Sequence, residues 1–493
     1  MKWLAALRGR FAGRVLLFVS ATVFQALLSV AILPLTTVVL TASDFGCFAL
    51  MMSWAALASA FGDAGGSLAL PANYSIASIP ERRRMLSSFF VVSLLFSSSL
   101  AVLFLAAWPW LEQIMSVPEG PPRTTLILTA LLIPMKTATI LATNVFSVGG
   151  RGNAIAAQIA LQAVGSFAGT LISLFGLRLG VSSLFVGAVV GQVCSVGVAV
   201  AALGAEPWHV PSRRWFSVLR SHSLTSLAAG LTGGLRSIGE NSVVAANLNI
   251  SAVGYLSHAR LYHGTLLAGT NAIAVNVWST SLAEARNGQG QFPLTKRVWM
   301  PIHVLIAVFG VAFSCFGKEF VSLLTHDRLT PAAQLVPWFA LLLLLHVSGR
   351  TQNATVYANG GAKSLTNASS LISICCLAAL PFVVGKMGGV GWNGGLVGVV
   401  IILLAEAILF RAYIYWKSIS FRRPERFDDS RVVYGSIAII MSWLFNAYMA
   451  PGLMARLTLC LAVGAVTAVV ERESIHDLLR FLQNRSQTKI QNI

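Results

Sequence analysis

Charged side chains are scarce in this sequence. Lys, Arg, Asp and Glu make up 11% of its 493 residues, whereas about 25% is usual in a soluble domain. Hydrophobic residues reach 56%, and the mean hydropathy is +0.74. The apolar residues are gathered into runs of about 20 or more, long enough to cross a hydrocarbon core of about 30 Å. The shortage of charge therefore excludes a water-soluble enzyme and predicts a polytopic membrane protein.

Cysteine is also sparse, and the six cysteines form no ligand set. Each lies inside an apolar run, with no CxxC pair and no histidine at metal-ligand spacing. We interpret them as small apolar helix residues. The sequence therefore predicts neither a metal site nor a cofactor.

The sequence also lacks motifs for nucleotide binding and catalysis. The segment Gly360–Ser364 ends like the phosphate-binding loop of an ATPase, but Ala362 stands where that motif needs glycine. The segment Gly389–Gly394 fits GxGxxG, yet no strand–helix–strand unit surrounds it. HExxH and GxSxG are absent, and no loop is long enough for a soluble domain. We expect a transporter rather than an enzyme or an ATP-driven pump.

Apolar runs between charged or Pro/Gly breaks predict about fourteen transmembrane helices. Their approximate limits are 15–40, 46–70, 85–108, 123–147, 154–176, 179–203, 222–248, 252–283, 298–317, 332–358, 364–385, 391–416, 432–450 and 453–470. Residues 1–13 and 471–493 combine apolar and basic positions on helical faces, which predicts an interfacial helix at each end. The predicted fold class is an all-α polytopic membrane protein.

Basic residues sort onto one side of these predicted spans. With the N-terminus inside, the outside loops hold only Arg123, Arg178, Lys318, Arg328, Lys386 and Arg456. Such an asymmetry is a topology signal, so the net charge of +18 requires no nucleic acid partner. We expect a multi-pass membrane protein with both termini in the cytoplasm.

Short matches at nearly constant spacing indicate an internal repeat. Ser43–Gly46 matches Ser251–Gly254, and Val145–Gly150 matches Val356–Gly361. Each copy contains six predicted spans, an even number, so both copies have the same orientation in the membrane. Two such lobes facing each other are the plan of many transporters. The predicted parts are an N-lobe (14–210), a C-lobe (211–420) and two extra C-terminal spans (421–470).

Four cations lie well inside predicted spans, away from both ends, and we predict that they line a substrate site: Lys136, Arg236, Arg260 and Arg350. A central Lys or Arg costs about 2.5 to 3.5 kcal/mol on insertion scales, so these side chains are expected to face water or partners. Polar residues recur beside them: Thr129 and Thr143 with Lys136, Glu240 and Asn247 with Arg236, His258 and His263 with Arg260, and His346, Asn353 and Tyr357 with Arg350. Cationic groups in a water-filled cavity suit an anionic ligand, because Arg binds phosphate bidentately.

Some of these intramembrane charges have alternative explanations. Arg236 and Glu240 are four residues apart, a spacing that also gives an intrahelical ion pair. Arg260 is close enough to one span end that its side chain could snorkel to the interface. Asp63, Glu240 and Glu406 are acids within spans that could couple ion movement, with structural hydrogen bonding as the alternative.

Residues 33–70 resemble the opening helix pair of O-antigen-type polysaccharide flippases, in the multidrug/oligosaccharidyl-lipid/polysaccharide exporter superfamily. The points of resemblance are Pro34, the Ser43–Gly46 turn with Phe48, and Asp63–Ser67. Further points are Val253–Tyr255 with Arg260, similar to the start of the second lobe, and Gly149–Gly152 and Gly360–Gly361, similar to cytoplasmic turns. Ala252 departs from the family, which often has an acid there.

This resemblance implies a two-lobe flippase that moves an undecaprenyl diphosphate-linked polysaccharide unit across the inner membrane by alternating access. The implied partners are the anionic lipid-linked glycan, membrane lipids and, further, a polysaccharide polymerase or glycosyltransferases. An ion-coupled multidrug-type exporter of the same superfamily is the alternative, but it would favour acidic over basic cavity residues. A membrane-embedded polymerase or ligase is a third reading, although such enzymes usually present acids or histidines on a long outer loop.

Overall fold

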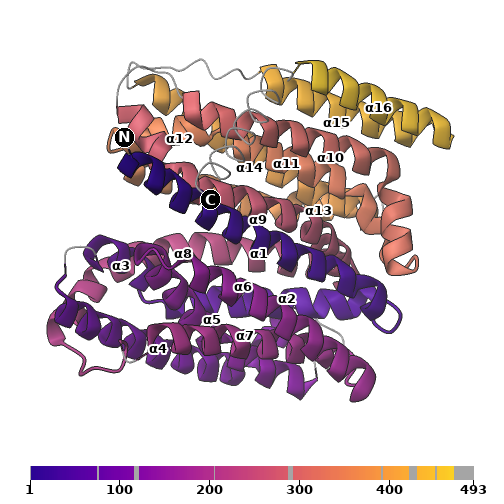
Figure 1. Cartoon of the computed structure of the whole chain (residues 1–493). Helices are drawn as coiled ribbons and strands as arrows, with labels where there is room; N and C mark the ends of the chain where they lie inside the picture. The colour runs from indigo at the N-terminus through magenta and orange to yellow at the C-terminus, as the bar shows by residue number, and fades with distance from the viewer. Residues whose placement is uncertain are drawn as a thin grey trace, which may run out of the picture. The chain divides into compact units, whose positions relative to one another are not determined.

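The computed structural model describes residues 2–74, 77–115, 122–204, 206–286, 293–389, 392–420, 430–449 and 452–470. Every regular element within these residues is a helix (Figure 1). The predicted all-α class is therefore confirmed. The helix predicted for the tail, 471–493, lies outside the described residues.

The helices follow the order of the predicted spans. The first half contains α1 (Lys2–Thr36), α2 (Ala42–Gly62), α3 (Gly66–Tyr74), α4 (Ile79–Met115), α5 (Arg123–Val148), α6 (Gly152–Leu171), the π-helical turn η1 (Ile172–Gly176) and α7 (Ser182–Leu203). The second half contains α8 (Arg213–Asn247), α9 (Ile250–Arg286), α10 (Pro293–Thr325), the 3-10 turn η2 (Thr330–Gln334), α11 (Val336–Ser348), α12 (Arg350–Ala358), α13 (Ala362–Gly388), α14 (Trp392–Ser420), α15 (Ser430–Met449) and α16 (Leu453–Val470).

Each predicted span lies on one or two of these helices. Among the described residues, 9 helical segments are long and apolar enough to cross a membrane, and shorter apolar helices accompany them. The chain is thus a multi-pass membrane protein, and the number of fourteen crossings stays a prediction. The helix α1 runs in one piece from Lys2 to Thr36, so the residues predicted to form a separate interfacial helix are its first turns.

The predicted span 46–70 is divided in the structure into α2 and α3. Between them, Ala64 and Gly65 have positive φ angles of 49° and 98°, a region that glycine tolerates better than alanine. Asp63 holds this corner, because its two carboxylate oxygens accept the Ser67 backbone N–H at 3.1 and 2.9 Å. The Asp-Ala-Gly-Gly sequence is therefore a corner between two helices rather than the end of one span.

The chain divides into two compact units. One comprises Met1–Ser257 and Leu380–Gly395, and the other comprises His258–Ala379 and Leu396–Ile493. These limits follow packing, whereas the predicted lobes follow the sequence repeat. The lobe boundaries therefore stay predictions.

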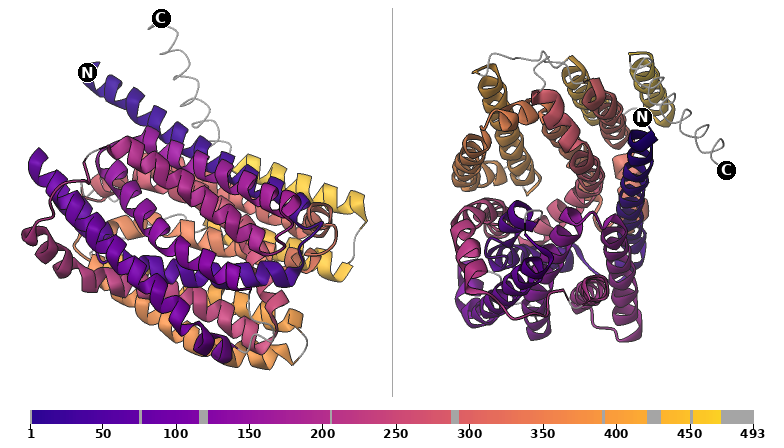
Figure 2. Two further views of the ribbon diagram at one scale, coloured as in Figure 1. Left: turned by 90° about the horizontal axis from the view of Figure 1, so that it is seen from below. Right: turned by 60° about the vertical axis from the view of Figure 1, so that its left-hand side comes forward.

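In the first unit the helices pack along their lengths, as Figure 2 shows. The helix α6 packs on α7 and α1, and α2 packs on α4, α5 and α8. Between α6 and α7 the contact depends on small residues. A Cβ at Gly187 would lie 1.9 Å from Thr170 Oγ1, and one at Gly191 would lie 2.7 Å from the Gln162 carbonyl oxygen. Glycines spaced in this way let membrane helices approach until van der Waals packing holds them.

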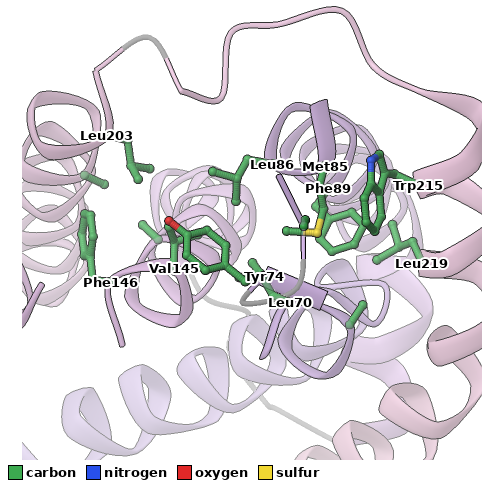
Figure 3. Packing of buried hydrophobic residues seen from close by; sticks show 14 of the residues in the cluster. Leu70, Tyr74, Met85, Leu86, Phe89, Val145, Phe146, Leu203, Trp215 and Leu219 are labelled. Carbon is green, nitrogen blue, oxygen red and sulfur yellow. The ribbon is translucent and has the colours of Figure 1, made fainter. Parts of the chain in front are cut away.

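A buried apolar cluster joins α8 to the helices of the first half of the chain (Figure 3). Phe89 of α4 meets Trp215 of α8 edge to face, with ring centroids 6.4 Å apart and ring planes at 85°. Such aromatic pairs add about 0.5 to 1.5 kcal/mol to the burial of their area. Leu70 and Tyr74 of α3 belong to the same cluster. The start of α8 is thereby fixed to α4 and α3.

The two copies of the predicted repeat meet at corresponding glycines. A Cβ at Gly46 of α2 would lie 1.9 Å from the Ile250 carbonyl oxygen, and a Cβ at Gly254 of α9 would lie 1.9 Å from the Ala42 carbonyl oxygen. Ala42 precedes Gly46 by the same spacing by which Ile250 precedes Gly254. The contact is therefore identical seen from either helix, as expected where two copies of one unit meet about a local two-fold axis.

In the second unit, α10 packs on α11, α15 and α16, and α15 and α16 lie side by side (Figure 1). Arg456 of α16 forms an ion pair with Glu319 of α10. On the other helices of this unit, His263 Nδ1 of α9 lies 3.0 Å from the Phe339 carbonyl oxygen of α11. The two extra C-terminal helices thus pack on the rest of the second unit through α10 and α11.

Candidate functional site

Lys136 lies near the middle of the 26-residue helix α5. Thr139 and Thr143 follow it at spacings of three and seven, which places all three on one helix face. The Thr139 hydroxyl donates to Gln192 Oε1 of α7 at 2.9 Å, and the Thr143 hydroxyl lies 3.0 Å from Gln158 Oε1 of α6. The face that carries Lys136 therefore contacts α7 and α6 of the first unit through these two threonines.

The Lys136 ammonium has no hydrogen-bond acceptor and no acidic partner among the described residues. By contrast Thr129, one heptad earlier, is buried and donates to the Thr125 carbonyl oxygen at 2.7 Å. An unpaired cation inside a spanning helix costs about 2.5 to 3.5 kcal/mol. The Lys136 side chain is partly buried, and none of the described residues compensates its charge.

Arg236 and Glu240 of α8 form an intrahelical ion pair. Arg236 Nε lies 2.9 Å from Glu240 Oε1, and the two side chains are 29% and 7% exposed. The next residue, Asn241, donates to Ser53 Oγ of α2 at 2.6 Å, so this part of α8 packs against α2. The structure thus contains the ion pair that the four-residue spacing offered as an alternative. A ligand-binding role for Arg236 stays a prediction.

We expect Glu240→Leu to lower the free energy of unfolding by about 3 kcal/mol, because it removes the carboxylate from a buried ion pair. The double variant Arg236→Met/Glu240→Leu should recover most of this loss, since two apolar side chains of similar size replace the pair. Thermal unfolding of the purified proteins in detergent measures both effects. Equal stability of the wild type and Glu240→Leu would show that the pair contributes nothing.

The predicted span 332–358 is interrupted at Gly349, between α11 and α12. Arg350 is the first residue of α12, and its guanidinium carbon lies 5.8 Å from the ring centroid of Trp299 on α10. A cation over an indole face is favourable at such a distance. Interrupted helices place helix ends and charged side chains at the binding sites of many transporters.

The polar residues predicted to accompany Arg350 lie on two different helices, because Gly349 separates α11 from α12. His346 lies on α11, where its Nδ1 is 2.9 Å from the Leu342 carbonyl oxygen of its own helix. Asn353 lies on α12, and its Oδ1 is buried with no hydrogen-bond donor among the described residues. Tyr357 lies near the end of α12 and is exposed. Of these neighbours, Asn353 is the one that offers a buried polar atom to a ligand near Arg350.

A second guanidinium lies at the same interruption. A Cβ on Gly349 would lie 3.5 Å from Arg411 Nη1 of α14. The distribution of basic residues assigns Arg411 to the cytoplasmic side, together with Lys417. However, α14 continues to Ser420, so Arg411 lies more than two turns inside the helix. The structure therefore adds Arg411 to Arg350 as a candidate for binding an anion.

Arg260 lies about 15 Å along α9 from the first residue of that helix. Snorkelling of its side chain to the interface stays the alternative to a ligand-binding role. The two neighbouring histidines have protein partners: His258 Nε2 lies 3.1 Å from the Tyr262 hydroxyl, and His263 Nδ1 lies 3.0 Å from the Phe339 carbonyl oxygen. His263 thus connects α9 to α11, and a ligand-binding role for Arg260 stays a prediction.

The buried acids proposed for ion coupling also have protein partners. Asp63 accepts the Ser67 backbone N–H at the corner between α2 and α3. Glu406 of α14 accepts a hydrogen bond from the Ser373 hydroxyl of α13. Both acids are buried. These contacts are those of a structural role, and ion coupling by Asp63, Glu240 or Glu406 stays a prediction.

The four predicted cations divide equally between the two units. Lys136 and Arg236 lie on α5 and α8, which both pack on α2 in the first unit. Arg260 and Arg350 lie on α9 and α12 in the second unit. A single cavity lined by all four stays a prediction.

A family model described as "Polysaccharide biosynthesis protein" matches residues 37–334. The match covers more than half of the chain and extends from the end of α1 to η2. It includes three of the predicted cations and stops short of Arg350. No curated protein matches the chain in sequence.

Several solved structures share the fold. One is the lipid II flippase MurJ in an inward closed conformation, with 15% identity, a TM-score of 0.69, and coverage of 93% of this chain and 100% of that one. Another is an inward-facing multidrug resistance MATE family transporter of the MOP superfamily, with 16% identity, a TM-score of 0.62, and coverage of 82% and 96%. A third is a MOP superfamily transporter from Pyrococcus furiosus whose binding pocket of reverse polarity suggests a different function, with 15% identity, a TM-score of 0.54, and coverage of 83% and 96%.

Proposed function

The chain belongs to the family of polysaccharide biosynthesis proteins, and from that premise we propose that it is a flippase for a lipid-linked polysaccharide unit. The proposed cargo is a glycan carried on undecaprenyl diphosphate, and the proposed location is the bacterial inner membrane with both termini in the cytoplasm. The shared fold with a lipid II flippase and with exporters supports transport by alternating access. Glycosyltransferases that supply the cargo, or a polymerase that consumes it, are the proposed protein partners.

The observation that carries this proposal is the Lys136 ammonium. It lies in a spanning helix, on a face that contacts other helices, with no acceptor among the described residues. A lysine so placed is stabilised when a ligand brings negative charge to it. A diphosphate carries that charge, and a compact ammonium binds phosphate as a point charge.

The interruption between α11 and α12 supplies a second point of contact for the cargo. Arg350 and Arg411 both lie beside Gly349. A guanidinium group can donate two parallel hydrogen bonds to two oxygens of one phosphate or carboxylate. We propose that these residues, with Arg260 and Lys136, receive the diphosphate and the acidic sugars of the glycan. The apolar carrier chain needs no polar site, because it stays in the bilayer.

An ion-coupled exporter of cationic drugs would require acids that are available to its cargo. The three acids within the predicted spans have protein partners instead: Asp63 with Ser67, Glu240 with Arg236, and Glu406 with Ser373. Among the described residues Lys136 has no such partner, which favours an anionic cargo over a cationic one.

Reconstitution of the purified protein into vesicles tests this function. We expect a fluorescent lipid-linked oligosaccharide to move between the leaflets faster than in protein-free vesicles, and the assay is repeated with a proton gradient and with a sodium gradient. A cationic dye is the matched alternative cargo. Movement of the dye without movement of the lipid would favour the exporter, and polymerised glycan in the product would favour an enzyme.

A further inference from the structure

The second unit contains a groove at the turn between α12 and α13. None of the four predicted cations lines it. Its volume is about 690 Å³, and its walls come from this turn, the first turns of α13 and the last turns of α14. The segment Gly360–Ser364, which resembles a nucleotide-binding loop in sequence, forms one end of it. In the structure this segment is a tight turn, with Gly360 at a φ of 78°, followed by a long membrane helix.

The groove carries positive charge from two helices. Lys363 of α13 is exposed, and Lys417 of α14 lies with its ammonium 5.9 Å from the Trp416 ring centroid. Both lysines line the groove, and no acidic residue is among its described lining. The beginning of α13 adds the partial positive charge of a helix N-terminus. An anion is therefore the ligand that this lining favours.

The walls of the groove are fixed to each other. The Tyr413 hydroxyl of α14 is hydrogen-bonded to the Ser364 hydroxyl of α13, one residue from Lys363 and four from Lys417. Asn367, one turn further along α13, adds an amide group to the lining. The two lysines thus line one groove from two helices that are hydrogen-bonded to each other beside it.

The groove continues into an apolar surface along α13. Leu371, its last lining residue on this helix, is 64% exposed, and Ile374, on the same face, is 57% exposed. Cys375 and Ala378 extend this exposed stripe. In a spanning helix such a surface faces lipid chains. The site thus has a cationic polar end and an apolar extension, which matches a lipid rather than a soluble anion.

We propose that this groove binds the phosphate group of a membrane lipid, with Lys363 and Lys417 at the phosphate and the lipid chain along the exposed stripe of α13. The distribution of basic residues predicts that Lys363 lies on the cytoplasmic side, where basic pockets between transmembrane helices bind phosphate head groups. Two lipids carry this chemistry: an anionic phospholipid, and the diphosphate carrier of the cargo. The second source rests on the proposed function, and the first does not.

Native mass spectrometry of the purified full chain tests the site by titration with dioleoylphosphatidylglycerol and, separately, with undecaprenyl diphosphate. We expect the double variant Lys363→Gln/Lys417→Gln to bind one of these lipids about 10- to 30-fold more weakly than the wild type, since each lysine near a phosphate contributes to binding. Loss for the phospholipid identifies a head-group site, and loss for the diphosphate identifies a site for the cargo. The control Lys386→Gln removes a lysine at the opposite end of α13 and should change neither affinity.

A second variant keeps both lysines and the size of every side chain. Asn367→Asp adds a negative charge to the lining that both lysines share, so it should weaken binding of the same lipid that the double variant weakens. Unchanged affinity for both lipids in the double variant and in Asn367→Asp would overturn the proposal. Because the readout is binding and not leaflet transfer, failure of the proposed function would leave the phospholipid titration interpretable.

Discussion

Lys136→Ala should slow leaflet transfer of a lipid-linked oligosaccharide by about 10- to 100-fold, the loss expected when a charged hydrogen-bonding group is removed from a bound anion. Lys136→Arg keeps the positive charge and should retain part of the rate, although its geometry differs. Lys136→Ala should leave the protein as stable as the wild type or more stable. This follows because Lys136 has no acceptor among the described residues and its burial is therefore uncompensated.

The pairing of lost transfer with retained stability separates a ligand-binding role from a structural one. Vesicle transfer measures the first, and thermal unfolding in detergent measures the second. Lys386→Ala is the matched control, since it removes an exposed lysine at the end of α13. If Lys136→Ala is folded and transfers the lipid at the wild-type rate, Lys136 is not part of the cargo site.

Gly254→Ala should destabilise the protein by about 2 kcal/mol or more, as overpacking of a close contact does. The added methyl group would lie 1.9 Å from the Ala42 carbonyl oxygen, and the next nearest atoms also belong to the backbone. No side chain can rotate away to make room. The first turns of α2 and α9 would have to separate, and thermal unfolding in detergent should report the loss.

Two comparisons make this second prediction specific. Gly264→Ala, on the same helix with no atom within 4 Å of the added Cβ, should be neutral or stabilising, because alanine is the better helix former. The double variant Gly46→Ala/Gly254→Ala should cost less than the sum of the single variants, since one separation of the helices accommodates both methyl groups. Additive losses would mean that the two glycines act at independent contacts.

The sequence predicts helices well here because each span is an apolar run bounded by charge or by turn residues. It predicts interruptions within a span less well. Gly349 follows the run of leucines at 341–345 with no proline nearby, so nothing local distinguishes it from a glycine inside a continuous helix. The sequence Asp-Ala-Gly-Gly at residues 63–66 does indicate a turn. It also ends an apolar run, so the sequence does not distinguish a corner within the membrane from the ordinary end of a span.

The candidate site shows the same division. Lys136 and Arg350 stand out in the sequence because a cation in an apolar run is costly wherever it lies. Whether a partner within the protein stabilises the charged side chain depends on contacts between residues that the composition does not reveal. Arg236 proves to be paired with Glu240. Arg411, close enough to a helix end to be assigned to a loop, lies beside Gly349 instead.

The reciprocal contact of Gly46 and Gly254 also bears on how the two halves of the chain can diverge. Most positions of a duplicated unit drift independently once the copies are fused in one chain. At this contact each glycine makes room for the other helix, so a larger residue in either copy disturbs both. For the predicted repeat, the pair thus marks a point where the two copies are expected to change only together, and it predicts the register in which they should be aligned.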